Sequence, residues 1–289
     1  PTQLPKSPTT GSATFLLPEK PGQTVDSPQQ PREILVYPKH STGSLDSHMT
    51  DTRTDGRACD ELRPISFELD YQRAPAASVL VSCGNTRVIC AASVLDSVPR
   101  WMSAEGKQGG WVTAEYQMLP GSTGPRCSRE RSKPSGRSSE IQRLIGRSLR
   151  SVVDLEKLPG KTISLDCDVL DADGGTRCAS ICGSAVALEL ALLRLFEAGQ
   201  LTQWPLVSRV AAVSVGMLDG REILDLCYEE DSAAAVDMNV VMDEAGGFVE
   251  VQGTGEESTF SREELNALID LAAGGNAELA RLQREALGL

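Results

Sequence analysis

Histidine is almost absent from this 289-residue sequence, and its scarcity excludes several kinds of catalytic site. The two histidines, His40 and His48, both precede Met49. The rest of the chain therefore has no imidazole for a Ser-His-Asp triad, a Cys-His pair or a histidine-bound zinc ion. Proton transfer must depend there on carboxylates, a metal ion or the substrate itself.

The sequence also lacks a CxxC pair and any uninterrupted apolar run close to the ~20 residues that span a bilayer. Eight cysteines are scattered along it, several at inward positions of apolar segments, so we interpret most of them as small buried residues rather than as disulfides or metal ligands. No charged-then-apolar signal pattern opens the chain. We therefore expect a cytoplasmic protein that does not contact a membrane.

A generally basic surface is missing as well, because the formal net charge is −12, which argues against indiscriminate binding to nucleic acid. Positive charge is instead local: residues 121–150 carry eight cations and two acids, a net charge of +6. From Glu140 an apolar stripe predicts a helix, on which Arg143, Arg147 and Arg150 form a second stripe that suits a solvated face or an oligomer contact.

Four cations of the same segment precede this helix, in a Gly/Pro/Ser-rich loop: Arg126, Arg129, Arg131 and Lys133. They have no helical face to solvate. A flexible basic loop is suited to following a phosphate backbone, so we predict that these four residues contact the backbone of a nucleic acid.

The first 48 residues are rich in Pro, Ser, Thr and Gln and show no periodicity. We predict a disordered tail over 1–48 and a folded domain over 49–289. The string around Met49 resembles a cloning junction or a start placed too far upstream, and a native disordered extension is the alternative.

Residues 162–198 predict a buried strand, a glycine turn at Gly174-Gly175 and an apolar helix. Unpaired N–H groups and the helix dipole favour an anion at such a helix start, where Thr176 adds a hydroxyl and Arg177 a guanidinium. Phosphate is the anion that we expect to bind there. The alternative is that the glycines only turn the chain and Arg177 pairs with a local carboxylate.

The remaining elements predict an α+β fold rather than a doubly wound parallel sheet. Hairpins are expected at Gly84-Asn85, at Asp219-Gly220 and near residues 245–247. A mobile loop is expected over 99–110, and a capping box at 261–264 opens a terminal helix that Gly274-Gly275 splits.

Asp231 and Asp237 stand between the last two hairpins, next to two glutamates. Carboxylates this close are costly unless a cation lies among them, and oxygen ligands without histidine or cysteine suit Mg²⁺ or Mn²⁺. A solvated turn is the alternative, and Asp225 is a competing candidate. An anion site, an acidic metal site and a basic loop together suggest phosphoryl transfer on a polynucleotide.

The ordered motifs of the chain resemble those of the bacterial ribonuclease PH family, from about residue 53 to the end. The runs that carry the resemblance are DGRxxDELRPI at 55–65, GWVTAEYQMLP at 110–120, SGRxxEIQRLIGRSLR at 135–150, DCDVLxADGGTR at 166–177, YEEDSxAxVDMNVVM at 228–242 and VEVQGTGEE at 249–257.

This resemblance implies a ribonuclease PH-like fold, with two related β-rich α/β halves in one domain like domain 2 of ribosomal protein S5. It implies a homo-hexameric ring of three dimers that trims tRNA precursors and other RNA 3′ ends, with inorganic phosphate as the attacking co-substrate and nucleoside 5′-diphosphates as products. By matching motif, the residues that bind phosphate are Arg137, Gly175, Thr176 and Arg177. Asp231 and Asp237 are the implied pair that supports the divalent metal or acts as general acid. The resemblance also implies that the basic loop with Arg126, Arg129, Arg131 and Lys133 binds RNA.

Two positions depart from the family pattern. Gly121 stands where these enzymes usually have arginine, and residues 107–110 are less basic than in many relatives. We expect phosphorolysis to be retained with a weaker grip on structured tRNA. Two rivals stay open: a ring subunit that binds RNA without cutting it, and a metal-dependent nuclease that uses water.

Overall fold

Two β-sheets organise the part of the chain that the computed structural model describes, residues 53–131, 133–256 and 259–289. The chain divides into the units Pro1–Met49 and Thr50–Leu289, of which the second holds the described residues. The predicted tail over 1–48, with both histidines, lies outside them.

The first sheet has the strand order β1-β2-β3-β5-β4. Its strands are β1 (Ile65–Leu69), β2 (Ala77–Cys83), β3 (Thr86–Leu95), β4 (Trp111–Met118) and β5 (Thr162–Asp171). The β2–β3 hairpin turns at Gly84-Asn85 as predicted. Only β4 and β5 run parallel among the described strands of this sheet, and helix α2 (Gly136–Ser151) lies in the crossover that a parallel pair requires.

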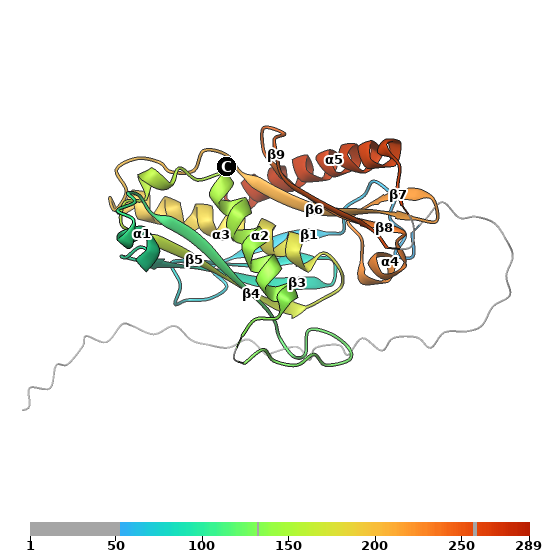
Figure 1. The fold of residues 1–289 in the computed structure, drawn as a ribbon, viewed down its shortest axis with the longest axis horizontal. Helices are drawn as coiled ribbons and strands as arrows, with labels where there is room; N and C mark the ends of the chain where they lie inside the picture. The colour runs from blue at the N-terminus through green and yellow to red at the C-terminus, as the bar shows by residue number, and fades with distance from the viewer. Residues whose placement is uncertain (1–52, 132, 257–258) are drawn as a thin grey trace, which may run out of the picture. The chain divides into compact units, whose positions relative to one another are not determined.

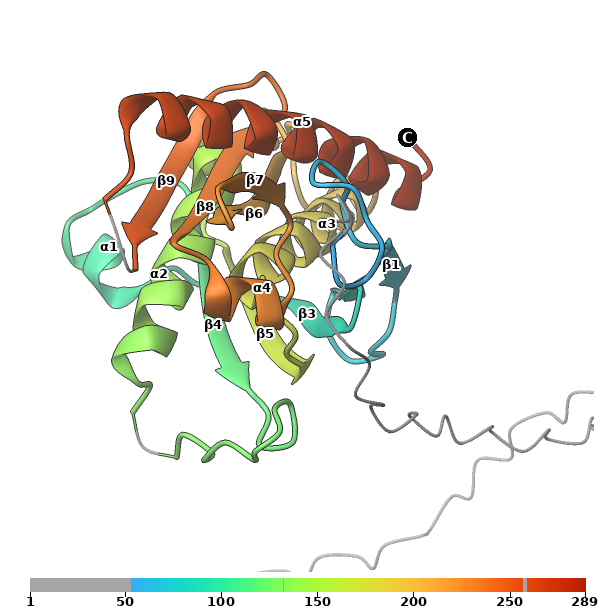
Figure 2. The same cartoon turned by 90° about the vertical axis from the view of Figure 1, so that its right-hand side faces the viewer.

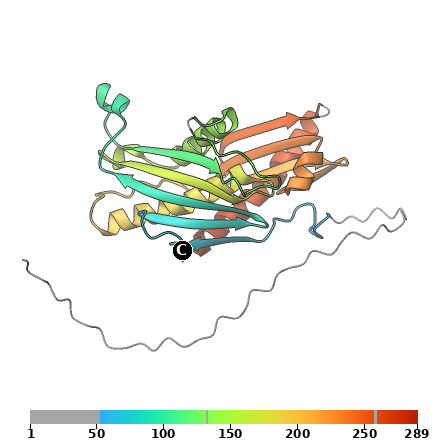
Figure 3. The ribbon, with the colours of Figure 1, turned by 90° about the horizontal axis from the view of Figure 1, so that it is seen from below.

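The second sheet is antiparallel throughout, in the order β7-β6-β8-β9. Its strands are β6 (Val210–Leu218), β7 (Arg221–Leu224), β8 (Val236–Asp243) and β9 (Phe248–Gly255). Asp219 (φ 52°) and Gly220 (φ 74°) make the predicted hairpin turn, because both central residues of a type I′ turn need positive φ. Figure 3 shows the strands of the first sheet beside the orange strands of the second.

Helix α3 (Thr176–Glu197) packs against strands of both sheets, β2, β3 and β5 of the first and β6 of the second. Its apolar side chains join one hydrophobic core that draws on both sheets. By length and composition α3 is the one helix among the described residues that could cross a membrane. In the fold, 72% of its most apolar window is buried, as in the core helix of a soluble protein.

Helix α5 (Arg262–Ala286) covers the second sheet, as Figure 2 shows, and begins at the predicted capping box of Ser261 and Glu264. The prediction that Gly274-Gly275 splits it is wrong, because the helix runs through both glycines. Gly275 permits a close approach: a Cβ there would lie 2.7 Å from Cδ1 of Leu224 on β7. The pair therefore serves packing rather than termination.

The segment 99–110 is not entirely a loop, because Arg100–Ala104 forms the short helix α1. Trp101 on this helix packs edge to face on Trp111, with ring centroids 5.0 Å apart, and Lys107 lies over the Trp101 ring. The backbone N–H of Gly110 bonds to Leu155. Figure 1 shows the resulting arrangement of sheets and helices, which confirms the α+β prediction.

Candidate active site

The start of α3 has the geometry expected of an anion site. Gly175 is its N-cap residue, in the left-handed region (φ 63°), and makes no side-chain cap, so the first N–H groups of the helix stay unpaired by a capping side chain. Thr176 is buried at the first helical position, and Arg177 follows it. These unpaired donors and the helix dipole favour an anion in front of Gly175.

The glycine turn before α3 is held from below by an ion pair. Arg63 donates to both carboxylate oxygens of Asp225, and its Nη1 donates to the carbonyl of Asp173. Thr86 Oγ1 also donates to the carbonyl of Gly174, at 2.7 Å. A Cβ on Gly175 would lie 3.0 Å from Nη2 of Arg63. Side chains from β3 and the segment before β1 thus fix the turn.

Arg177 and Arg137 place guanidinium groups at this site that no short contact with another described residue holds in place. Arg177 has only long contacts, 3.4 Å from Nη1 to Oε1 of Gln252 and 3.9 Å from Nη2 to Oε2 of Glu140. Its partial pairing with Glu140 agrees in part with the alternative of a local carboxylate, but both distances leave it able to bind an anion. Arg137, in the first turn of α2, is exposed, and its side chain makes no hydrogen bond or ion pair within the part of the chain that the structure describes.

Asp231 and Asp237 reach the site from the second sheet. Asp231 lies on α4 (Tyr228–Ala233), and Asp237 lies on β8 opposite Gly216. Burial and then the charge of Asp231 raise the pKa of Asp237 to about 6, against the opposing effects of Arg177 and Arg137. Burial also raises the pKa of Asp231. The two carboxylates are therefore close enough to repel each other and incompletely neutralised.

This pair fits Mg²⁺ or Mn²⁺ by its donor chemistry. No group of three or more His, Cys, Asp and Glu side chains suited to a metal occurs among the described residues. Mg²⁺ needs only one or two carboxylates when substrate phosphates and waters complete its shell. Two half-buried carboxylates with raised pKa values gain charge compensation from such an ion.

Asp225, the competing candidate, has a different role. It is 4% exposed and does not line the site cavity. Burial alone would raise its pKa, but the hydrogen bonds and charge of Arg63 outweigh burial and hold the pKa low. Its carboxylate is committed to Arg63 and supports the glycine turn.

One cavity of about 500 Å³ gathers the predicted phosphate and acidic residues. Its lining includes Arg137, Gly175, Thr176, Arg177, Asp231 and Asp237. Figure 2 shows α4 and the loop between β4 and α2 on the same side of the molecule, and residues 123–125 of this loop line the cavity too. Three sequence motifs and the loop residues 123–125 thus converge on one cavity.

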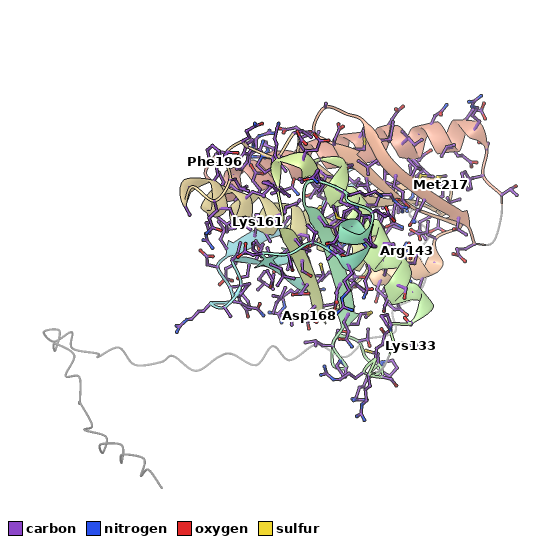
Figure 4. All side chains as sticks on the ribbon, turned by 60° about the vertical axis from the view of Figure 1, so that its left-hand side comes forward. Lys133, Arg143, Lys161, Asp168, Phe196 and Met217 are labelled. Carbon is purple, nitrogen blue, oxygen red and sulfur yellow. The ribbon has the colours of Figure 1, made fainter. Side chains whose placement is uncertain are left out.

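The predicted RNA-binding cations do not line this cavity. Arg131 and Lys133 line a second cavity of about 390 Å³, beside Asp168 and two other carboxylates on β4 and β5. Arg126 and Arg129 line neither of the two. Figure 4 shows Lys133 on the projecting loop and Asp168 on β5. None of the four cations forms an ion pair among the described residues, although the charge of Arg129 opposes the burial that raises the pKa of Asp168. Their guanidinium and ammonium groups can therefore bind an external anion.

A buried charge network beneath the site was missed by sequence reasoning. Arg53 makes a two-bond pair with Glu230, at 2.7 Å and 2.6 Å, and Arg57 bonds to the carbonyl of Asp225. Arg53 and Glu230 are 6% and 2% exposed. Glu230 lies directly before Asp231, so the network fixes α4. The sequence signal that could have indicated this network is the group of three arginines within residues 53–63, next to the pattern of a buried strand.

The two departures from the usual motif pattern, Gly121 and residues 107–110, differ in the space that surrounds them. Gly121 is exposed, and a Cβ there would meet no atom within 4 Å. Gly110, in contrast, is enclosed, since a Cβ there would lie 2.2 Å from the carbonyl oxygen of Leu158. The structure thus has room for a side chain at 121 and none at 110.

Comparison with known proteins identifies the family. A model of the 3′ exoribonuclease family, domain 1, matches residues 61–193, and the model of domain 2 of that family matches residues 208–275. A ribonuclease PH of Bacillus velezensis is 57% identical over 240 residues, 82% of this chain and 97% of the relative. A ribonuclease PH of Corynebacterium kroppenstedtii is 58% identical over 237 residues, 81% of this chain and 92% of the relative.

Solved structures share the fold at low sequence identity. Rice (Oryza sativa) Rrp46 has a TM-score of 0.67 at 20% identity, covering 82% of this chain and all (100%) of its own. A chain of the Archaeoglobus fulgidus exosome, solved with RNA bound to the active site, has a TM-score of 0.68 at 21% identity and covers 80% of this chain and 92% of its own. Matching motifs, matching family models and the shared fold agree, and the chain belongs to the ribonuclease PH family of 3′ exoribonucleases.

Proposed function

We propose that this phosphorolytic 3′-to-5′ exoribonuclease trims the 3′ ends of tRNA precursors with Arg137, Gly175, Thr176 and Arg177 binding inorganic phosphate. The observation that carries the assignment is the single cavity in which these residues face Asp231 and Asp237. An anion held at the α3 N-terminus has the two arginines around it and the acidic pair across from it.

The chemistry needs little more than orientation and charge stabilisation. A phosphate oxygen attacks the phosphorus of the last phosphodiester, the bond from that phosphorus to the 3′-oxygen of the preceding nucleotide breaks, and that oxygen takes up a proton. The products are a nucleoside 5′-diphosphate and an RNA shorter by one residue. Because phosphate is already a nucleophile, a body without histidine is adequate.

Asp231 and Asp237 are proposed to hold Mg²⁺ or Mn²⁺, which would offset the negative charge of the two reacting phosphates. The alternative to metal binding is that Asp237, whose pKa is raised to about 6 by burial and by the charge of Asp231, donates a proton to the leaving oxygen. Arg137 and Arg177 orient the attacking phosphate in either case.

Arg126, Arg129, Arg131 and Lys133 are proposed to bind the RNA backbone, and the assembly to be a homo-hexameric ring. Support for RNA contact comes from the absence of ion pairs at these loop cations within the described ranges 53–131, 133–256 and 259–289. Support for assembly comes from two structures with the same fold, the Archaeoglobus fulgidus exosome and an archaeal exosome core. Light scattering at micromolar concentration checks the ring, and a mass of 30.9 kDa, that of the single chain, would contradict it.

Product analysis tests the function directly. The protein is incubated with a tRNA that carries extra 3′ nucleotides, with Mg²⁺, in phosphate buffer and in a phosphate-free buffer. Nucleoside diphosphates that form only with phosphate are expected. Nucleoside monophosphates without phosphate would establish the hydrolytic rival instead, and RNA binding without any product would establish the non-cutting ring subunit.

A further inference from the structure

Tyr116 places a buried hydroxyl directly behind the predicted phosphate site. The residue lies on β4 and is 2% exposed. Its hydroxyl oxygen is 2.9 Å from Oγ1 of Thr176, and no other side-chain hydrogen-bond partner is recorded for it among the described residues. Thr176 in turn lines the site cavity.

The hydroxyls of Tyr116 and Thr176 differ in the hydrogen-bond partners that they can reach. A buried tyrosine O–H needs an acceptor, and Thr176 Oγ1 is the acceptor that the described residues offer it. If Thr176 donated instead, the buried proton of Tyr116 would have no partner, and an unpaired buried donor destabilises the fold. Tyr116 is therefore the donor, and the proton of Thr176 is left to point elsewhere.

The hydroxyl proton of Thr176 can point into the site cavity, which Thr176 lines. Thr176 is the first residue of α3, where the backbone N–H groups already point toward the expected anion. A hydroxyl that accepts from Tyr116 and donates outward adds one donor to that set. We propose that Tyr116 is a positioning residue that orients the Thr176 hydroxyl toward the attacking phosphate. This inference rests on the proposed function of the same site.

The test compares Tyr116→Phe with the unaltered enzyme. We expect the KM for phosphate to rise roughly fivefold, the value of one net hydrogen bond, while the KM for RNA stays the same. Tyr71→Phe removes the same atom from an exposed tyrosine and is the matched control, expected to change neither KM. Thermal unfolding of each variant measures any effect on the fold.

A double-mutant cycle decides whether Tyr116 acts through Thr176. Thr176→Val alone should raise the phosphate KM and lower the protection that phosphate gives against thermal unfolding. Adding Tyr116→Phe to Thr176→Val should change neither measurement further. An unchanged phosphate KM in Tyr116→Phe, an equal rise in both KM values, or an additive effect in the double variant would overturn the proposal.

Failure of the positioning role is distinguishable from failure of the proposed function. If the unaltered protein releases no nucleoside diphosphate in phosphate buffer, the function is wrong and the role of Tyr116 falls with it. If the unaltered protein is phosphorolytic and the Tyr116→Phe variant behaves like Tyr71→Phe, only the positioning role is wrong.

Discussion

Arg63 donates two side-chain hydrogen bonds to Asp225, from Nε to Oδ2 at 3.0 Å and from Nη2 to Oδ1 at 2.7 Å, directly beneath Gly175. The pair is almost completely buried, with side chains 4% and 6% exposed. A buried pair of this kind fixes the backbone that presents the phosphate donors, although neither residue lines the cavity itself. The phosphate site therefore depends on the Arg63–Asp225 pair as well as on the residues that line the cavity.

Asp225→Asn should change how the free energy of unfolding depends on pH, because it removes the carboxylate that pairs with Arg63. Because the folded pKa of Asp225 lies below its ordinary value of 3.8, its contribution is present above pH 3.8 and is lost as the pH falls through the folded pKa. We expect the variant to be about 3 kcal/mol less stable at pH 6 and to lose less than the unaltered protein on acidification. Thermal unfolding between pH 6 and pH 3 measures both.

Asp96→Asn is the matched control for that experiment, since Asp96 pairs with Lys161 at 2.6 Å but its side chain is 85% exposed. Exposed pairs contribute about 0–1 kcal/mol, so this variant should follow the unaltered protein. Equal behaviour of the two variants would contradict the supporting role of Asp225.

Arg177→Ala should raise the phosphate KM by at least roughly tenfold, because a charge-assisted contact to phosphate is lost. The fold should be unaffected, since the contacts of Arg177 with Gln252 and Glu140 are long. Arg177→Lys keeps the charge without the planar fork and should fall between the two. Steady-state kinetics at varied phosphate decides, and an unchanged phosphate KM would remove Arg177 from the site.

Asp237→Asn should lower turnover by roughly 10²-fold or more, because the variant has neither a metal-binding carboxylate nor a proton donor. RNA binding, measured by fluorescence anisotropy, should survive. Glu229→Gln changes an exposed acid on α4 and serves as the control. Full activity of Asp237→Asn would move the acidic role to another residue of the cavity.

Arg126, Arg129 and Arg131 changed together to Gln should weaken RNA binding in a salt-dependent way. Each lost phosphate contact lowers the slope of log K against log salt by about 0.7 for a single strand, so the triple variant should lose roughly 2. The phosphate KM should stay constant. Arg73→Gln, at an exposed arginine between β1 and β2, is the control, and an unchanged salt slope in the triple variant would show that RNA passes elsewhere.

Gly121→Arg should tighten binding of structured tRNA without loss of stability. The position has open space around it and no positive φ that a side chain would strain. Gly121→Ala adds a Cβ without charge and separates the effect of the cation from that of the backbone. Equal tRNA affinity of the two variants would show that the missing arginine does not limit binding.

The sequence predicted those features that have a local cause. The hairpins at Gly84 and Asp219 follow from turn residues that need positive φ, and the start of α3 follows from its glycine pair. The short helix α1 and the unbroken α5 were not predicted, because each depends on a tertiary contact. For α5 that contact is the packing of Gly275 on Leu224.

The same distinction applies to the site. Thr176 and Arg177 were found because a glycine turn before an apolar helix has a recognised chemistry, while their partners Arg137, Asp231 and Asp237 needed the family motifs as well. Asp225 was ambiguous because sequence gives no indication of which arginine a carboxylate will meet. Its partner Arg63 is 162 residues away.

Helix α3 joins the two halves of the molecule in a way that affects how they unfold. It lies almost wholly within the segment matched by domain 1 of the family, yet it covers β6, which belongs to the segment matched by domain 2. A fragment of residues 208–275 would expose the apolar face that α3 covers. The two family domains therefore share one hydrophobic core, and we expect them to unfold together.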